Sequence, residues 1–295
     1  MTSAQASPGS ASTASPGLAP PAPASTVSSV ASFSQASAVT ALGDGGYAAS
    51  LSSSWAVGDR PHGGYLLAVV VRAALAEAAT VSDAAPDPLA VSAQFLRPPL
   101  CAPAVVRTAV RSSGRTITVV NAVLEQDGRT CVEATVTCGV LPSDEPAWAD
   151  LPTLPADPPD DAVDIGAQPG NIFHVGSVCE MRLDVATAGF ATGRTDLPPV
   201  TRIWARPVGE DPDPLFALVA GDISPPVVFN LGRVGWSPTV QLTALLRARP
   251  APGWLRVQAD TRALHDRWFD EDHTVIDSAG RLVCQARQLA IAPAL

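Results

Sequence analysis

Residues 64–79 read GYLLAVVVRAALAEAA, an apolar run interrupted only by Arg72 and Glu77. A helix of this composition is apolar nearly all round, so it must be buried on most of its sides. Residues 215–222, LFALVAGD, form a second, shorter apolar helix candidate about 150 residues later. Each candidate precedes a series of strand-like segments, so the same order of elements occurs twice along the chain.

The strand candidates alternate apolar and polar side chains, which predicts strands with one buried and one solvated face. Asp127-Gly128 and Ala279-Gly280 predict tight turns that join the last two strands of each half as antiparallel hairpins. The candidates are residues 89–96, 105–110, 116–124 and 130–140 in the first half, and 239–246, 254–264, 268–276 and 282–291 in the second.

One buried helix wrapped by an antiparallel sheet, made twice by internal duplication, predicts an α+β fold of the double hotdog type. We expect two antiparallel sheets, each around a central helix, joined by an acidic Pro-rich linker. The expected segments are a disordered Ser/Ala/Pro-rich tail over residues 1–32, an N-terminal hotdog over 33–141, the linker over 142–177 and a C-terminal hotdog over 178–295.

The tail and the linker are recognised by composition. Residues 1–42 contain no charged residue and consist mostly of Ser, Ala, Pro and Thr, so most of this segment cannot bury enough apolar surface to become ordered. Residues 142–170 are rich in Pro and Asp and contain no basic residue. This pattern is typical of a linker between two folded units.

Charge and residue usage exclude several function classes. With 28 acidic and 19 basic residues the net charge is −9, which argues against nucleic acid or an anionic membrane as a partner. Every basic residue is arginine, so no lysine can form a Schiff base or a phosphate loop. His174, His265 and His273 lie far from one another and from other ligand types, so we expect no metal.

Cysteine usage and the N-terminal sequence suggest a compartment. The five cysteines are odd in number, scattered and never spaced as CxxC, which indicates neither a disulfide framework nor a zinc site. No uncharged apolar run reaches the length of a membrane span, and the N-terminus lacks the pattern of a signal peptide. We therefore expect a cytoplasmic protein.

Comparing the two halves picks out candidate catalytic residues, because a position that is apolar in one half and polar in the other needs an explanation. Aligning the two hairpin turns places Gln288 opposite Val136, and the offset of the halves places Thr239 opposite Leu89. Asp222 ends the second apolar helix, where burial of its carboxyl would raise its pKa. Together they supply an acceptor, a hydroxyl and an amide, which suit the holding and deprotonation of a water.

A second candidate site precedes the long helix, where the sequence reads Arg60-Pro61-His62-Gly63-Gly64-Tyr65. Glycines at a helix N-terminus let a ligand approach free backbone N–H groups, and the helix dipole there favours negative charge on an oxygen. We predict an oxyanion or substrate-binding site formed by His62, Gly63, Gly64 and Tyr65. The alternative is a glycine-rich helix entry capped by His62. Ser224 lacks the GxSxG context of a nucleophilic serine.

The chain resembles the acyl-CoA thioesterase II (TesB-like) family. In the first half the resemblance rests on residues 61–65, on Phe95-Leu96-Arg97-Pro98, on Gly114-Arg115-Thr116 and on Gln126-Asp127-Gly128. In the second half it rests on Gly221-Asp222, on Trp236-Ser237-Pro238-Thr239 and on Arg287-Gln288-Leu289. In that family an Asp, a Thr and a Gln orient the hydrolytic water, and Asp222, Thr239 and Gln288 match them. The stretch between Asp222 and Thr239 is shorter in this chain than in the best-known bacterial members of the family.

The resemblance implies hydrolysis of an acyl-CoA or acyl-carrier thioester by an activated water, with no cofactor, in a homo-oligomer with a role in lipid metabolism. One rival is a hotdog hydratase or dehydratase, suggested by Gly221-Asp222 followed by Pro225, although that chemistry would want a histidine shortly after the Asp. A second rival is a non-catalytic acyl-thioester binding protein that kept the fold and lost the reaction.

Overall fold

The computed structural model describes residues 1–2, 31–166 and 172–294. The tail expected over residues 1–32 therefore lies almost entirely outside the described residues. In the first half, the helices are α1 (Phe33–Ala36) and α2 (Gly63–Ala78), with a 3-10 turn at Ser53–Trp55. The strands are β1 (Val39–Gly43), β2 (Gly46–Ser50), β3 (Ala56–Val57), β4 (Arg60–Pro61), β5 (Asp87–Phe95), β6 (Pro103–Ser113), β7 (Thr118–Gln126) and β8 (Arg129–Gly139).

The second half contains α3 (Pro214–Ala220) and 3-10 turns at His174–Ser177, Gly189–Thr192 and Val227–Leu231. Its strands are β9 (Val163–Asp164), β10 (Cys179–Leu183), β11 (Val200–Pro207), β12 (Thr239–Leu246), β13 (Leu255–Asp260), β14 (Leu264–His265), β15 (Trp268–Ile276) and β16 (Leu282–Ile291). All eight strand candidates and both helices of the sequence analysis correspond to elements of the structure. The sequence analysis did not find the strand pairs β1–β2 and β10–β11.

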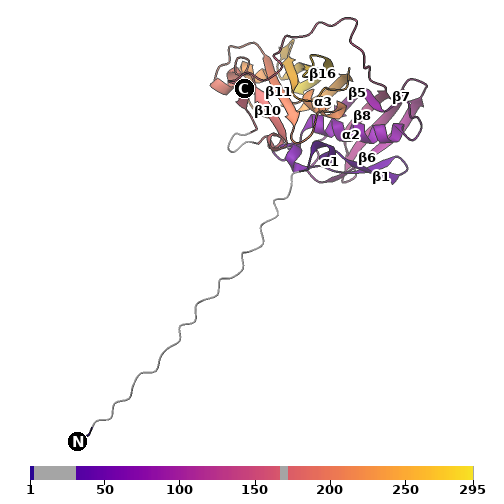
Figure 1. The fold of residues 1–295 in the computed structure, drawn as a ribbon, viewed down its shortest axis with the longest axis horizontal. Helices are drawn as coiled ribbons and strands as arrows, with labels where there is room; N and C mark the ends of the chain where they lie inside the picture. Colours follow the sequence, from indigo (N-terminus) through magenta and orange to yellow (C-terminus); the bar gives the residue numbers. More distant parts are fainter. Residues whose placement is uncertain (3–30, 167–171, 295) are drawn as a thin grey trace.

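Apart from β3 and β4, which pair with each other in a separate two-stranded sheet, the strands form one antiparallel sheet (Figure 1). Its order is β1-β2-β6-β7-β8-β5-β12-β16-β15-β13-β11-β10-β9, with β14 paired to β15. Two antiparallel sheets, one around each helix, were expected, and the structure joins them into one: β5 and β12 hydrogen-bond to each other, with Gln94 opposite Gln241 and Ala90 opposite Leu245. Outward from this junction the two halves repeat the same order, so β5, β8, β7, β6, β2 and β1 correspond to β12, β16, β15, β13, β11 and β10.

The register corrects one pairing of positions between the halves. Pro88 pairs with Cys138 in β5–β8, and Thr239 pairs with Ala290 in β12–β16. Each of these central strands then has a bulge one residue later. Pro88, and not Leu89, is therefore the counterpart of Thr239. A constant sequence offset between the halves takes no account of the residue that a bulge inserts into a strand.

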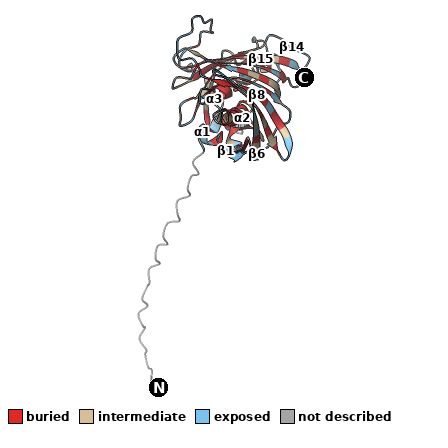
Figure 2. Ribbon diagram, turned by 90° about the vertical axis from the view of Figure 1, so that its right-hand side faces the viewer, coloured by how far each residue is buried: buried red, intermediate tan, exposed pale blue. Residues whose placement is uncertain are grey.

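The core lies between the helices and the inner face of the sheet. Helix α2 packs on β5, β6, β7 and β8, while α3 packs on α2 and on strands of the second half. Figure 2 shows both helices and the strand segments against them as buried. One hydrophobic cluster runs through both halves, from Phe33 and Trp55 to Val283. The halves thus share a single core as well as a single sheet.

Part of the expected linker belongs to the second half of the fold. Strand β9 pairs with β10, and Leu154 is buried in a small cluster with Trp204 and Ile276. The Trp204 indole N–H donates to the Pro155 carbonyl at 3.1 Å. This segment is therefore held to the sheet over much of its described length. None of the helices among the described residues has the length and apolarity needed to cross a membrane.

Candidate active site

Asp222 lies where the two helices meet. It follows α3, and its side chain is 8% exposed. Its Oδ2 accepts a hydrogen bond from the Gly64 N–H at 2.6 Å, in the first turn of α2. Burial raises the pKa of this carboxyl, while His62 and the Gly64 N–H act in the opposite direction. The carboxyl is thus held at the positive end of the α2 dipole.

The two glycines of the HGG segment are needed for this approach. A Cβ at Gly63 would lie 2.6 Å from Asp222 Oδ2, and one at Gly64 would lie 2.8 Å from the Cα of Val219. Glycine at Gly64 lets the α2 and α3 backbones come together, and glycine at Gly63 leaves space beside the carboxyl. The two consecutive glycines are therefore explained by the close packing of the two helices and by the space needed beside the Asp222 carboxyl.

The other two residues of the segment differ in position. His62 precedes α2 without capping it through its side chain, and its Nε2 lies 3.9 Å from Asp222 Oδ2. Tyr65 points into the core instead: its hydroxyl donates to the Ala36 carbonyl at 2.7 Å and accepts from the Ser52 N–H at 3.1 Å. Tyr65 is fully buried, so we do not include it among the residues that contact a substrate.

Thr239 and Gln288 form a hydrogen-bonded pair, although they are 49 residues apart in the sequence. Thr239 begins β12, and Gln288 faces inward from the neighbouring strand β16. The Thr239 hydroxyl donates to Gln288 Oε1 at 2.5 Å. The amide nitrogen of Gln288 donates to Glu271 Oε2, on β15. Antiparallel pairing thus lines up side chains of three adjacent strands in one chain of hydrogen bonds.

Packing brings Asp222 into the same region, although no hydrogen bond between described residues joins it directly to Thr239 or Gln288. At Gly221, just before Asp222, an added Cβ would lie 3.1 Å from the Ala286 Cβ on β16. The charge of Asp222 also contributes to the raised pKa of Glu271. The structure therefore places His62, Gly63, Gly64 and Asp222 at the α2–α3 contact. The hydrogen-bonded chain of Thr239, Gln288 and Glu271 lies on the strands that α3 packs against.

Sequence reasoning missed Glu271, which is 1% exposed. Its Oε1 accepts from the Val227 N–H at 2.9 Å. Burial raises the pKa of this carboxyl to about 8, against the effect of the two N–H donors. The segment WFDEDHTVI contained a signal, because strand alternation places Phe269, Glu271 and His273 on the same face. A Glu and a His facing a core call for an explanation.

Ser224 and His273 lie beside Glu271 but do not form a catalytic triad with it. The Ser224 Oγ lies 3.0 Å from His273 Nε2, and Glu271 Oε2 lies 3.9 Å from the same nitrogen. A triad needs the carboxylate on the other ring nitrogen, and His273 Nδ1 has no partner among the described residues. Burial lowers the pKa of His273 to about 4, so the imidazole is neutral near pH 7.

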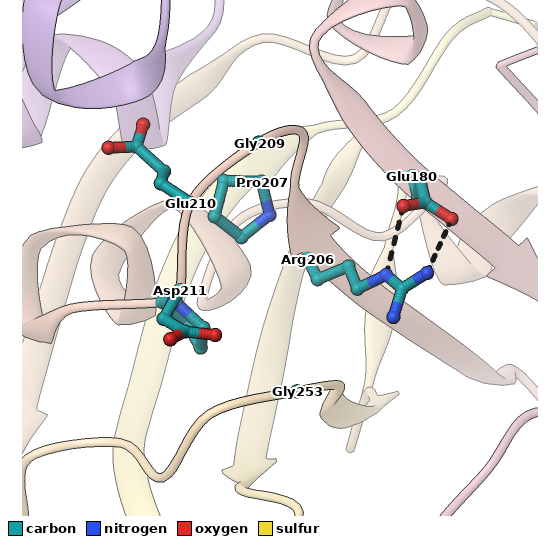
Figure 3. A pocket seen from close by; sticks show the side chains of 8 residues that line it. Glu180, Arg206, Pro207, Gly209, Glu210, Asp211 and Gly253 are labelled. Atoms are coloured by element: carbon teal, nitrogen blue, oxygen red, sulfur yellow. Dashed lines mark hydrogen bonds and ion pairs between the residues drawn. The ribbon is translucent and has the colours of Figure 1, made fainter.

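Two surface pockets lie away from these residues. One, of about 360 Å³, is lined by Glu180, Arg206 and Glu210 among others, and its arginine is already bound to Glu180 through two hydrogen bonds (Figure 3). Another, of about 490 Å³, lies over β12, β13, β15 and β16. Neither is lined by Asp222, Thr239 or Gln288. Among the described residues no group of three His, Cys, Asp or Glu side chains is placed to hold a metal ion.

Comparisons with known proteins cover nearly the whole folded part of the chain. Residues 51–139 match the model of an acyl-CoA thioesterase N-terminal domain, and residues 149–292 match that of an acyl-CoA thioesterase C-terminal domain. An uncharacterized protein of Mycobacterium tuberculosis is 42% identical over 264 residues, which is 83% of this chain and 90% of that protein.

Solved structures share the fold. A candidate thioesterase II from Thermobifida fusca has 34% identity and a TM-score of 0.78, covering 89% of this chain and 97% of that one. An acyl-CoA thioesterase II from Mycobacterium marinum, TesB2, has 14% identity and a TM-score of 0.66, covering 89% and 98%. On these matches and on the duplicated fold, the chain belongs to the acyl-CoA thioesterase family, among the TesB-like proteins with a double hotdog fold.

Proposed function

We propose that this protein hydrolyses an acyl thioester, acyl-CoA or acyl-carrier, to a free acid and a thiol, with Asp222 as general base. The observation that carries the proposal is the buried Asp222 carboxyl at the N-terminus of α2, beside the Thr239–Gln288 pair. Membership of the acyl-CoA thioesterase family supports thioester hydrolysis in general. The roles proposed for Asp222, Thr239 and Gln288 are those that the family resemblance implies, and the geometry of these side chains supports them.

The attacking water is held by acceptors on two sides. Asp222 uses Oδ2 for the Gly64 N–H, and its Oδ1 has no hydrogen-bond partner among the described residues. On the other side, the oxygens of Thr239 and Gln288 keep lone pairs beyond the bond between them. A water that donates one proton to Asp222 and the other to this pair has its own lone pair free for the substrate carbonyl carbon.

The N-terminus of α2 polarises the carbonyl. Because the Gly64 N–H is bonded to Asp222, the donor assigned to the substrate oxygen is the Gly63 N–H, which no described residue accepts. The helix dipole favours the negative charge that develops on that oxygen. His62, whose Nε2 lies 3.9 Å from Asp222, belongs to the same wall of the site.

Atoms and charges balance without a cofactor. The water oxygen bonds to the carbonyl carbon as Asp222 takes its proton, and the tetrahedral intermediate then collapses with cleavage of the carbon–sulfur bond. The proton returns from Asp222 to the leaving sulfur, so the products are a carboxylic acid and a thiol. The raised pKa of the buried Asp222 suits a group that must accept and return a proton.

The test is a panel of acyl-CoA thioesters with detection of the released thiol, run on wild type and on Asp222→Asn purified in parallel. We expect hydrolysis by wild type well above the variant. Tight binding of a thioester by wild type without any release would favour the non-catalytic binding protein. Addition of water to an enoyl-CoA, with the thioester left intact, would favour the hydratase.

A further inference from the structure

Glu271 lies directly across from Gln288, since the two residues are register partners in the β15–β16 pair. It is almost fully buried, and each of its two oxygens meets one N–H donor. The Val227 backbone N–H donates to Oε1 at 2.9 Å, and the Gln288 amide nitrogen donates to Oε2. The side chain therefore has fixed partners on both sides.

These contacts decide which way the Gln288 amide points. A glutamine amide has a donor end and an acceptor end of nearly equal size, and the two are exchanged by a half-turn about its last bond. Both carboxyl oxygens of Glu271 act as acceptors in the structure, Oε1 for the Val227 N–H and Oε2 for Gln288, so the NH₂ end of Gln288 faces β15. The oxygen end must then face Thr239, and the Thr239 hydroxyl does donate to Gln288 Oε1 at 2.5 Å.

We propose that Glu271 is a positioning residue: it locks the Gln288 amide so that Oε1 faces Thr239 and the attacking water. Its catalytic consequence rests on the proposed function, whereas the orientation of the amide does not. Glu271 contacts neither substrate nor water in this scheme. It acts through Gln288, and it also anchors the chain that follows Asp222 by accepting from Val227.

The neighbouring His273 cannot take over this role. Its Nε2 lies 3.9 Å from Glu271 Oε2, beyond hydrogen-bond distance, and 3.0 Å from the Ser224 hydroxyl. His273 also has no contact that would distinguish the two ends of the Gln288 amide. Within the described residues, Glu271 is the acceptor of the Gln288 NH₂ group.

The first variant is Glu271→Gln, which keeps the size of the side chain. The amide at position 271 has only one oxygen, and this oxygen must face the Val227 N–H to accept its hydrogen bond. Its NH₂ end then faces the NH₂ end of Gln288, so two donors would meet. The Gln288 amide must flip to relieve this, which presents its NH₂ end to Thr239. We expect kcat to fall about 10- to 100-fold with KM within about twofold, as for loss of a supporting group behind a reactive one.

The second variant exchanges the two residues, Glu271→Gln/Gln288→Glu. The amide at 271 then accepts from Val227 and donates to the carboxylate at 288, which accepts from Thr239 through its other oxygen. Every hydrogen bond is remade and an oxygen again faces Thr239. We expect kcat at least about fivefold above that of Glu271→Gln alone. Failure of the exchange to recover activity, with both variants folded, would mean that Glu271 only fills and supports the core.

Asp87→Asn is the matched control. Asp87 is a buried carboxylate that accepts from the Leu141 N–H at 3.0 Å, but it lies at the end of β5 farthest from the pairing of Gln94 with Gln241. This variant should lose stability through its own contacts and keep the wild-type kcat. A kcat loss equal to that of Glu271→Gln would show a general effect of disturbing a buried carboxylate, and would overturn the proposal.

A readout without turnover separates this inference from the proposed function. The side-chain NH₂ resonances of Gln288 in an ¹⁵N-labelled protein are identified by their absence in Gln288→Ala. We expect them to shift strongly in Glu271→Gln and not in Asp87→Asn. If the Gln288 resonances shift strongly in Glu271→Gln but wild type hydrolyses no thioester, the positioning role stands and the proposed function is rejected. Unmoved resonances with unchanged kcat in an active enzyme would reject the positioning role alone.

Discussion

The two halves place very different side chains at equivalent positions of the same sheet. In the second half, Thr239, Glu271, His273 and Gln288 occupy positions that in the first half are held by Pro88, Val120, Ala122 and Val136. All of these residues are buried except Thr239, which is partly exposed. One fold therefore tolerates either set, and the first half shows that the apolar set is sufficient for folding.

Stability does not account for the polar set of the second half. A buried carboxylate costs desolvation energy that hydrogen bonds offset only in part, and apolar side chains of similar size often do as well or better. The polar residues of the second half must also satisfy one another, because each orphaned group would cost about 1–3 kcal/mol. On the proposed function, this set serves the chemistry, to which the equivalent positions of the first half do not contribute.

Replacing Asp222, the proposed general base, should have the strongest effect on turnover. Asp222→Asn keeps the shape and can still accept from Gly64, but it no longer takes a proton. We expect kcat for thioester hydrolysis to fall by about 10²–10⁴ with KM largely unchanged. Steady-state assays on the best substrate of the panel measure this. Unimpaired hydrolysis by the folded variant would refute the assignment of the base.

The second prediction gives the second half the residues of the first. Gln288→Val should lower kcat by about 10²-fold and leave the Glu271 carboxylate without its amide donor. Adding Glu271→Val should recover part of the lost stability, since the uncompensated carboxylate is gone, without recovering activity. Urea unfolding of both variants checks the order of stability. A double variant less stable than Gln288→Val would contradict the comparison.

The third prediction makes the reverse exchange. Val136→Gln places an amide in the first half where Val120 and Pro88 offer no partner, so it should destabilise the fold by about 1–3 kcal/mol. Because Val136 lies away from the Asp222 site, kcat should stay within about twofold of wild type. Denaturation and turnover are measured on the same preparation. A fully stable Val136→Gln would show that the first half can satisfy polar groups after all.

The smallest effect concerns pH. Burial raises the pKa of Glu271 from its ordinary value of 4.5 to about 8, so between these values the folded state holds a proton that the unfolded chain has released. The free energy of unfolding should therefore decrease as pH rises across this range. The lowered pKa of His273, about 4 against an ordinary value of 6.5, has the opposite effect: between these two pH values the free energy of unfolding should increase with pH.

Between pH 6.5 and 8 the Glu271 effect is thus separated from that of His273. Wild type should lose on the order of 1 kcal/mol more stability over this interval than Glu271→Gln does. The difference is obtained from urea unfolding at the two pH values. Glu133→Gln, at an exposed position on β8, serves as control and should retain the wild-type slope. Identical slopes for wild type and Glu271→Gln would mean that Glu271 is already ionised at pH 6.5.

The sequence predicted the long elements well because their side-chain patterns are local. Strands β12, β15 and β16 have the predicted bounds, and α2 differs by one residue at each end. The pair β1–β2 was missed because its small residues, including GDGG at the turn, carry little alternation. The pair β10–β11 was missed because 16 residues separate its two strands, so no hairpin signal joins them.

The site was only partly predictable for a related reason. Asp222, Gln288 and Thr239 stood out as polar residues in apolar surroundings, and the structure shows Thr239 hydrogen-bonded to Gln288. Their roles in a reaction stay a prediction. Glu271 did not, because it lies among Asp270 and Asp272 and the segment resembles a solvated acidic strand. Strand alternation groups Glu271 with Phe269 rather than with the two aspartates, and the structure shows that this is the buried face. The junction of β5 with β12 likewise depends on tertiary packing that no local pattern records.

The docking of the acidic segment onto the sheet also bears on aggregation. A continuous sheet of this size ends in two strands whose outer backbone groups invite pairing with another molecule. At one end that strand is β9, which is only two residues long and lies in a stretch rich in Pro and Asp without a basic residue. Short length, proline and like charge all discourage edge-to-edge addition. The segment that joins the halves thereby also disfavours the addition of strands from other molecules at this edge of the sheet.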